Sequence, residues 1–148
     1  MPIGLDTDLP SPGAASERAQ RRRRPTSVLV IDDEPAIGAL FTRALKPLSV
    51  TFSQSAAGAL GRICAGADFA VIVCDVRMPG MDGLQFLEEV TKINPALVRR
   101  IVFVSGATCE PHFETFLKKT GCKFLEKPVA GDELKVVVET VAQAALAS

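Results

Sequence analysis

Acidic side chains follow two of the most apolar stretches of the sequence at the point where each stretch ends. Asp32 and Asp33 come directly after the apolar run 28–31, and Asp75 follows the run 69–74. Carboxylates that converge repel one another, and burial raises their pKa values unless a cation joins them. Oxygen ligands of this kind suit Mg²⁺, which combines one or two carboxylates with water and phosphate oxygens. The spacing therefore predicts a magnesium site that handles phosphate.

Two further polar side chains follow apolar runs later in the chain. Ser105 comes directly after the run 101–104, and Lys127 comes two residues after the run 123–125. An ammonium group and a hydroxyl can both bind phosphoryl oxygens opposite a metal ion. Each piece also has a simpler interpretation, because acids favour the first turn of a helix and a single lysine is usually a surface residue. Coincidence is a poor explanation for all of these polar residues together, because they follow four different apolar runs.

The apolar runs alternate with helical patterns, which is typical of βα units around a parallel sheet. The strands expected from these runs cover residues 28–31, 50–52, 69–74, 101–104 and 123–125. The first, third and fourth are continuously apolar, as strands covered on both faces must be, whereas the other two have polar neighbours and resemble edge strands. Because the carboxyl ends of parallel strands meet at one end of a sheet, the polar residues above are expected to lie together.

Apolar residues at helical spacing between the runs predict five helices. The stripes comprise Ile37, Leu40, Phe41, Ala44 and Leu45; Ala56, Leu60, Ile63 and Cys64; Phe86, Val90 and Ile93; Phe113, Phe116 and Leu117; and Leu134, Val137, Val138 and Val141. Ser55 is predicted to cap the second helix and Gly121 to close the fourth. The fifth has no side-chain cap at Ala130, although acids in its first turn favour the helix dipole.

Composition separates a short tail from a single domain. Residues 1–26 are rich in Arg and Pro and have no hydrophobic period, so they are expected to be a disordered tail ahead of one domain over 27–148. The run Arg21, Arg22, Arg23, Arg24 could touch nucleic acid or anionic lipid, but a solvated linker is the simpler interpretation. The whole chain has 17 basic and 17 acidic residues, and the tail holds five of the basic and three of the acidic ones. The slightly acidic remainder disfavours a broad nucleic-acid surface.

Hydropathy and cysteine usage predict a cytoplasmic protein with no membrane partner. No apolar run approaches the roughly 20 residues that a spanning helix needs, and the N-terminus has no stretch resembling the apolar core of a secretory signal. The four cysteines occur singly and there is one histidine, which gives neither a zinc pattern nor a disulfide framework. Free thiols fit a reducing compartment.

The segments VLVIDDE, VCDVRMPGMDG, VFVSGA and FLEKP resemble, in order and spacing, the receiver domain of bacterial two-component response regulators. The resemblance covers nearly all of residues 27–145, and the combination is specific although each piece alone is weak. It implies an α/β fold, a doubly wound five-stranded parallel sheet of the (βα)₅ flavodoxin-like type with strand order 2-1-3-4-5.

The resemblance implies a role for each acidic residue at the expected site. Asp75 would be the phosphoacceptor, with its carboxylate as the nucleophile. Asp33, Asp75 and the backbone carbonyl of Arg77 would bind Mg²⁺, and Asp32 would act mainly through bound water. The metal would offset the repulsion between anions.

The remaining family positions imply a switch. Lys127 would pair with the phosphoryl group, and its bond to Pro128 is expected to be cis. Ser105 would hydrogen-bond a phosphoryl oxygen and draw its loop inward, which would vacate space for the aromatic ring at Phe124. The alternative interpretation is that Phe124 is ordinary core on a short edge strand.

The partners follow from the same resemblance. A sensor histidine kinase or a histidine phosphotransfer protein would donate the phosphoryl group, so the chain would be a signalling domain rather than an enzyme. Because the sequence ends after the fifth helix pattern, a stand-alone receiver is expected. Its output would be a downstream protein or a homodimer, bound through the fourth helix, fifth strand and fifth helix.

Other functions stay open to different degrees. The main alternatives are a receiver-shaped interaction module that acts without phosphorylation and the receiver part of a hybrid histidine kinase. A haloacid-dehalogenase-type phosphatase is disfavoured because Asp75 is followed by Val76 and Arg77 instead of the pattern Asp-x-Asp. A flavodoxin-like flavin binder is disfavoured because the acids after the first run would repel its phosphate.

Overall fold

The computed structural model describes residues 26–106 and 111–147. The strands are β1 (Ser27–Ile31), β2 (Ser49–Ser53), β3 (Val71–Asp75), β4 (Ile101–Ser105) and β5 (Lys123–Glu126). The helices are α3 (Pro35–Ala44), α4 (Ala56–Cys64), α5 (Gly83–Ile93), the 3₁₀ helix η1 (Pro95–Arg100), α6 (Pro111–Thr120) and α7 (Gly131–Ala147). All of the tail expected over residues 1–26 except Thr26 lies outside the described residues.

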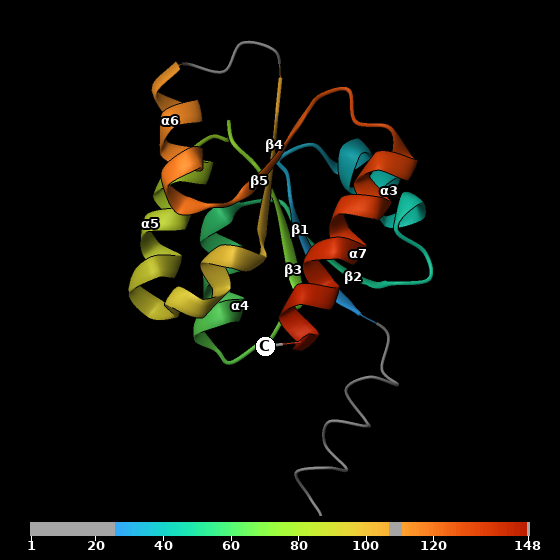
Figure 1. The fold of residues 1–148 in the computed structure, drawn as a ribbon, viewed down its shortest axis with the longest axis horizontal. Coiled ribbons are helices and arrows are strands. Elements are labelled where there is room, and N and C mark those ends of the chain that lie inside the picture. Colours follow the sequence, from blue (N-terminus) through green and yellow to red (C-terminus); the bar gives the residue numbers. More distant parts are fainter. Residues whose placement is uncertain (1–25, 107–110, 148) are drawn as a thin grey trace, which may run out of the picture.

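The five strands form one parallel sheet in the order β2-β1-β3-β4-β5, which confirms the predicted fold class. Strands β1, β3 and β4 are central and almost entirely buried, whereas β2 and β5 lie at the edges and are partly exposed. Helices α4, α5 and α6 lie on one side of the sheet, and α3 and α7 lie on the other (Figure 1). The result is three layers.

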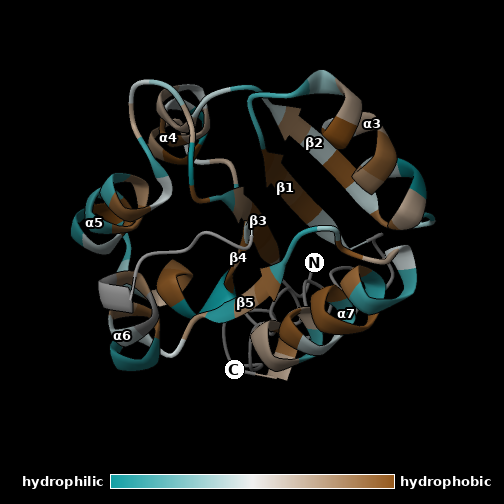
Figure 2. Cartoon of the chain, turned by 90° about the horizontal axis from the view of Figure 1, so that it is seen from above, coloured by the Kyte–Doolittle hydropathy of each residue, from teal (hydrophilic) through white to brown (hydrophobic). Residues whose placement is uncertain are grey.

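Alternate residues of the central strands feed two separate hydrophobic cores, because successive side chains of a strand point to opposite faces. Leu29, Ile72 and Phe103 belong to the core beneath α4, α5 and α6. Val30 and Val73 belong to the core beneath α3 and α7. The view from above shows apolar strands between helices whose apolar sides face inward (Figure 2). Each fully buried large apolar side chain contributes about 1.5–3 kcal/mol.

The structure confirms the two predicted helix caps, Ser55 at the start of α4 and Gly121 after the end of α6. The hydroxyl of Ser55 accepts a hydrogen bond from the backbone N–H of Gly58 at 3.0 Å. Gly121 follows α6 with a φ of 76°, a left-handed conformation that glycine adopts without steric cost. The backbone carbonyl of Ala130 accepts the first bond of α7, from Leu134 at 3.0 Å.

Four expectations were wrong in detail. Strand β3 begins at Val71 instead of Phe69, although Phe69 is still buried in the core. Leu40, Cys64 and Ile93 were placed on apolar helix stripes but are exposed, Leu40 and Ile93 by 50% and 42%, because no neighbouring element of the described residues covers them.

Among the described residues, no helix is long and apolar enough to cross a membrane.

Candidate functional site

The strand ends bring three aspartates together at one end of the sheet. Asp32 directly follows β1 and Asp75 is the last residue of β3, and both are buried, whereas Asp33 is exposed. One carboxylate oxygen from each lies within 4.8 Å of the others. Oxygen donors at this separation fit a hard divalent cation such as Mg²⁺, with the exposed side of Asp33 left open to water and a further ligand.

Lys127 lies between the two buried aspartates. Its Nζ is 3.3 Å from Oδ2 of Asp32 and 3.4 Å from Oδ2 of Asp75. The backbone N–H of Lys127 donates a hydrogen bond to the carbonyl of Ser105 at 2.7 Å, which fixes the position of the lysine backbone. The peptide bond between Lys127 and Pro128 is cis, as predicted. One cation thus neutralises part of a two-carboxylate cluster and leaves a net negative charge.

Burial and a neighbouring charge make the ionised form of Asp75 less favourable than it is in water. Burial raises the pKa of Asp75 above its usual value, and the carboxylate of Asp32 adds to the rise. The ammonium of Lys127 and the backbone N–H of Arg77 oppose these effects without cancelling them. For Lys127, burial alone would lower the pKa, but Asp75 and Asp32 together raise it, so the lysine stays charged. A second cation would relieve the remaining repulsion.

Backbone contacts fix the orientation of Asp32. Its Oδ1 accepts a hydrogen bond from the N–H of Glu34 at 2.9 Å, and its own N–H donates to the carbonyl of Ser53 at 3.1 Å. The first contact holds the carboxylate at the start of α3, while the second ties it to the end of β2. Oδ2 is therefore left to face Lys127.

Gly83 lets the backbone approach Asp75 closely, a role that no pattern in the sequence reveals. A Cβ at Gly83 would lie 3.0 Å from the carbonyl oxygen of Asp75 and 3.0 Å from Cα of Val76, so any larger residue would displace the strand end. Asp82 and Gln85 form a reciprocal capping box that starts α5 at this glycine. The Asp-x-x-Gln spacing could have revealed the cap, but the close approach depends on tertiary packing.

Ser105 and Phe124 lie on neighbouring strands but at different levels. Ser105 ends β4, is buried, and pairs in register with Glu126. Phe124 pairs with Phe103, two residues earlier, and is half-buried. Its ring makes an edge contact with Phe113 of α6 at a centroid distance of 6.0 Å, and Phe113 in turn contacts Phe103 at 5.9 Å. The two predicted switch residues are thus linked through β4 and an aromatic cluster.

Comparisons with known proteins identify one family and several similar proteins. The family model described as the response regulator receiver domain matches residues 28–139. The chain is 30% identical over 109 residues to the C4-dicarboxylate transport transcriptional regulatory protein DctD of Rhizobium meliloti, a match covering 73% of this chain and 23% of that protein. It is 28% identical over 129 residues to the sensor histidine kinase CheAY of Helicobacter pylori, covering 84% and 16% respectively. The chain therefore spans a quarter or less of the length of these relatives.

Solved structures give the same result. The receiver domain of the Francisella response regulator 1452 is 26% identical with a TM-score of 0.70, covering 80% of this chain and 98% of that one. The chemotaxis protein CheY4 of Vibrio cholerae is 25% identical with a TM-score of 0.70, covering 80% and 99%. The similarity extends over the whole of those domains.

Proposed function

Because the chain belongs to the response regulator receiver domain family of two-component systems, we propose that Asp75 accepts a phosphoryl group in a Mg²⁺-dependent reaction. The observation that carries the proposal is the contact of Lys127 with both Asp32 and Asp75 beside an oxygen cluster that includes Asp33. A buried aspartate with two acidic neighbours and one lysine has little structural value, but it can serve as a nucleophile beside a metal ion.

The reaction is a transfer from a phosphohistidine to a carboxylate. An oxygen of Asp75 attacks phosphorus, a P–O bond forms, and the P–N bond to the donor imidazole breaks with its electron pair remaining on nitrogen. Lys127 holds the transferred oxygens by charge, and the hydroxyl of Ser105 donates a hydrogen bond to one of them. When bound by Asp33, Asp75 and the carbonyl of Arg77, with Asp32 acting through water, Mg²⁺ would supply charge neutralisation for the transferring group.

We further propose a donor and an output. The relatives named as sensor kinases support a sensor histidine kinase or a histidine phosphotransfer protein as donor. Phosphorylation at Asp75 would move Ser105, and the aromatic cluster of Phe103, Phe113 and Phe124 supports coupling from there to the surface formed by α6, β5 and α7. That surface would bind a downstream protein or a second copy. The chain would act in the cytoplasm as a signalling domain, with no catalysis beyond its own phosphorylation and dephosphorylation.

The test is phosphorylation by a small donor, read as intact mass. The wild-type protein is incubated with acetyl phosphate or phosphoramidate, with Mg²⁺ or with EDTA, beside Asp75→Asn and the control Asp68→Asn. Asp68 is an exposed aspartate at the other end of the sheet, and the control makes the same chemical change. We expect one phosphoryl adduct on wild type and on Asp68→Asn, with Mg²⁺ only, and none on Asp75→Asn. A folded wild-type protein that gains no adduct, even from a set of phosphorylated histidine kinases, would favour an interaction module that works without phosphorylation.

A further inference from the structure

Phe52 and Gly38 form a close contact between β2 and the first turns of α3. Phe52 is the penultimate residue of β2, is half-buried, and packs on the face of the sheet that α3 and α7 cover. Gly38 is the fourth residue of α3 and is buried. A Cβ atom at Gly38 would overlap Cε1 of the Phe52 ring and would lie 2.6 Å from its Cδ1 and Cζ atoms. The ring therefore occupies the place of a side chain at position 38, and only glycine leaves room for it.

The conformation of α3 does not explain the glycine. Glycine is one of the poorest residues in a helix interior, because it loses the most backbone freedom on folding. Gly38 is not among the described residues with a positive φ, so no left-handed conformation requires glycine at this position. The close approach of the Phe52 ring is what the missing side chain of Gly38 permits.

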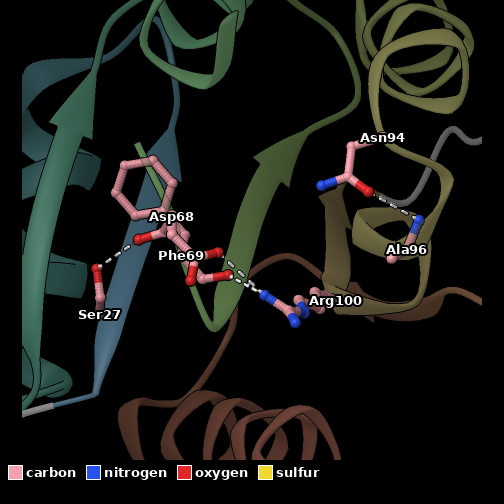
Figure 3. A network of polar contacts seen from close by, with 6 residues as sticks. All are labelled: Ser27, Asp68, Phe69, Asn94, Ala96 and Arg100. Carbon is pink, nitrogen blue, oxygen red and sulfur yellow. Dashed lines mark hydrogen bonds and ion pairs between the residues drawn. The ribbon is translucent and has the colours of Figure 1, made fainter. Parts of the chain in front are cut away.

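The start of α3 lacks the side-chain cap that other helices of the fold have. Ser55 and Asp82 cap α4 and α5 with their side chains. Asn94 caps η1, because its amide oxygen accepts a hydrogen bond from the N–H of Ala96 at 3.2 Å (Figure 3). Glu34 precedes α3, and its side chain makes no capping hydrogen bond. The position at which α3 begins is therefore fixed by other contacts.

A closed path of contacts links the Phe52 ring to the end of β1. The carbonyl of Ser53, the residue after Phe52, accepts a hydrogen bond from the N–H of Asp32 at 3.1 Å. Oδ1 of Asp32 accepts a hydrogen bond from the N–H of Glu34 at 2.9 Å. The carbonyl of Glu34 accepts one from the N–H of Gly38 at 3.2 Å. The packing of Gly38 against the Phe52 ring closes the path, so the segment from Asp32 to Glu34 is held between β2 and α3.

Asp33 lies inside this held segment and depends on it for its position. Its side chain is exposed, and no hydrogen bond or ion pair with another described residue holds it. One oxygen of its carboxylate nevertheless lies within 4.8 Å of the oxygens of Asp32 and Asp75. The backbone on either side of Asp33 is thus what places the carboxylate before a cation binds. A ligand that is already in place costs less ordering on binding.

We propose that Gly38 and Phe52 are positioning residues of the metal site. The Phe52 ring, packed on Gly38, keeps the backbone of residues 32–34 in place, so that Asp33 is positioned before Mg²⁺ binds. This inference rests on the proposed function, which assigns Mg²⁺ to Asp33 and Asp75. Gly38 and Phe52 do not touch the ion, and both act through the backbone that joins β1 to α3.

The test exchanges the sizes of the two groups in contact. Gly38→Ala adds a Cβ atom where the ring lies, Phe52→Val removes Cδ1, Cε1 and Cζ of the ring, and the double variant makes both changes. Gly61→Ala is the control for the glycine, because a Cβ atom at that position of α4 would meet nothing within 4 Å. Val50→Ala is the control for β2, because Val50 packs on the same face of the sheet near the start of the strand, opposite Val28.

Two quantities are measured by nuclear magnetic resonance on isotopically labelled protein. The first is the dissociation constant for Mg²⁺, from the shifts of amide signals during a titration, with Asp33→Asn as the test of the proposed site. The second is the rate of hydrogen exchange of the Asp32 and Glu34 amides in EDTA, relative to that of Val76. The N–H of Val76 donates to the carbonyl of Val104 at 3.1 Å, so its exchange reports a general loss of stability.

We expect Gly38→Ala and Phe52→Val to weaken Mg²⁺ binding about three- to tenfold, less than the roughly 10–100-fold typical of residues that hydrogen-bond a metal ligand directly. The amides of Asp32 and Glu34 should exchange at least about tenfold faster relative to Val76. The double variant should return both quantities to within about twofold of wild type, because the added Cβ then lies where the ring was. Both controls should match wild type.

Several results would overturn the proposal. Gly38→Ala could bind Mg²⁺ as tightly as wild type, or the double variant could bind it more weakly than either single variant. The Val76 amide could exchange faster in step with those of Asp32 and Glu34, which would show general destabilisation in place of a local role. Failure of wild type to bind Mg²⁺, or binding that Asp33→Asn does not weaken, would overturn the proposed metal site and this inference together. Unchanged variants of a wild type that binds the ion at Asp33 would overturn this inference alone.

Discussion

Each end of the sheet has a basic side chain in contact with aspartate, but the aspartates are buried at one end and exposed at the other. Where the strands finish, Lys127 contacts two buried carboxylates that repel each other. Where the strands begin, Arg100 contacts Asp68, whose side chain is 79% exposed, and also the carbonyl of Phe69. The second cluster stabilises the fold modestly and leaves no group in conflict. The first retains a conflict that only a further cation removes, which is what a binding site requires and a structural contact does not.

Removing Lys127 is expected to have the largest effect on stability. The substitution Lys127→Met leaves Asp32 and Asp75 without their common cation, and breaking a buried pair typically costs about 3–5 kcal/mol. Because the lysine side chain is 26% exposed, we expect a smaller loss, about 2–3 kcal/mol, in the free energy of unfolding measured by urea denaturation in EDTA. A loss below that for Arg100→Met would contradict the comparison.

Removing Arg100 is expected to cost less. The substitution Arg100→Met deletes a hydrogen bond to the carbonyl of Phe69 and an ion pair with an exposed carboxylate, together worth about 1–2 kcal/mol. Phosphorylation of Asp75 should be unchanged, because this contact lies at the other end of the sheet. Lys92→Met is the matched control, since the two side chains of its ion pair with Glu89 are 71% and 42% exposed. A phosphorylation defect in Arg100→Met would show that the two ends are coupled.

Neutralising Asp75 is expected to stabilise the protein without metal. Asp75→Asn removes a buried charge whose pKa is raised, so the variant should gain about 1 kcal/mol at neutral pH in EDTA. The gain has a defined sign with pH: it is absent below the ordinary pKa of 3.8, where the carboxyl is protonated in both states, it grows as the pH rises from there to the raised pKa of the folded state, and it stays constant above that. Thermal unfolding across this range measures it. Addition of Mg²⁺ should stabilise wild type and reverse the order.

The smallest effect is expected at Asp68. The carboxylate is exposed and its partner Arg100 keeps the bond to Phe69, so Asp68→Asn should change the free energy of unfolding by less than about 0.5 kcal/mol at any of these pH values. Mg²⁺ should stabilise this variant as it does wild type. A destabilisation equal to that of Arg100→Met would show that the Asp68 ion pair, and not the bond to Phe69, holds this end together.

Much of the fold was predictable because local and global signals agree. The apolar runs around Val30, Val73 and Phe103 match strands buried on both faces, and the caps at Ser55 and Gly121 are local chemistry that a sequence displays. The exposure of Ile93 was not predictable, because a helical stripe records spacing and not the reach of neighbouring elements. The short helix η1 has no stripe long enough to detect.

The charged residues of the site were predictable from the sequence, whereas the close packing of Gly83 against the end of β3 was not. Asp32, Asp75 and Lys127 end separate strands, and the parallel sheet alone brings them together. Gly83 carries no signal of its own, since its role comes from the distance between a helix start and a strand end.

The most direct test of the account is to locate the phosphoryl group within the chain. Wild type is treated with acetyl phosphate and Mg²⁺, the acyl phosphate is reduced with borohydride, and the modified residue is identified by tandem mass spectrometry of the digested protein. The account predicts modification at Asp75 alone, absent in EDTA. Modification at Asp32, Asp33 or Asp68 in place of Asp75, or at Asp75 equally without Mg²⁺, would contradict it.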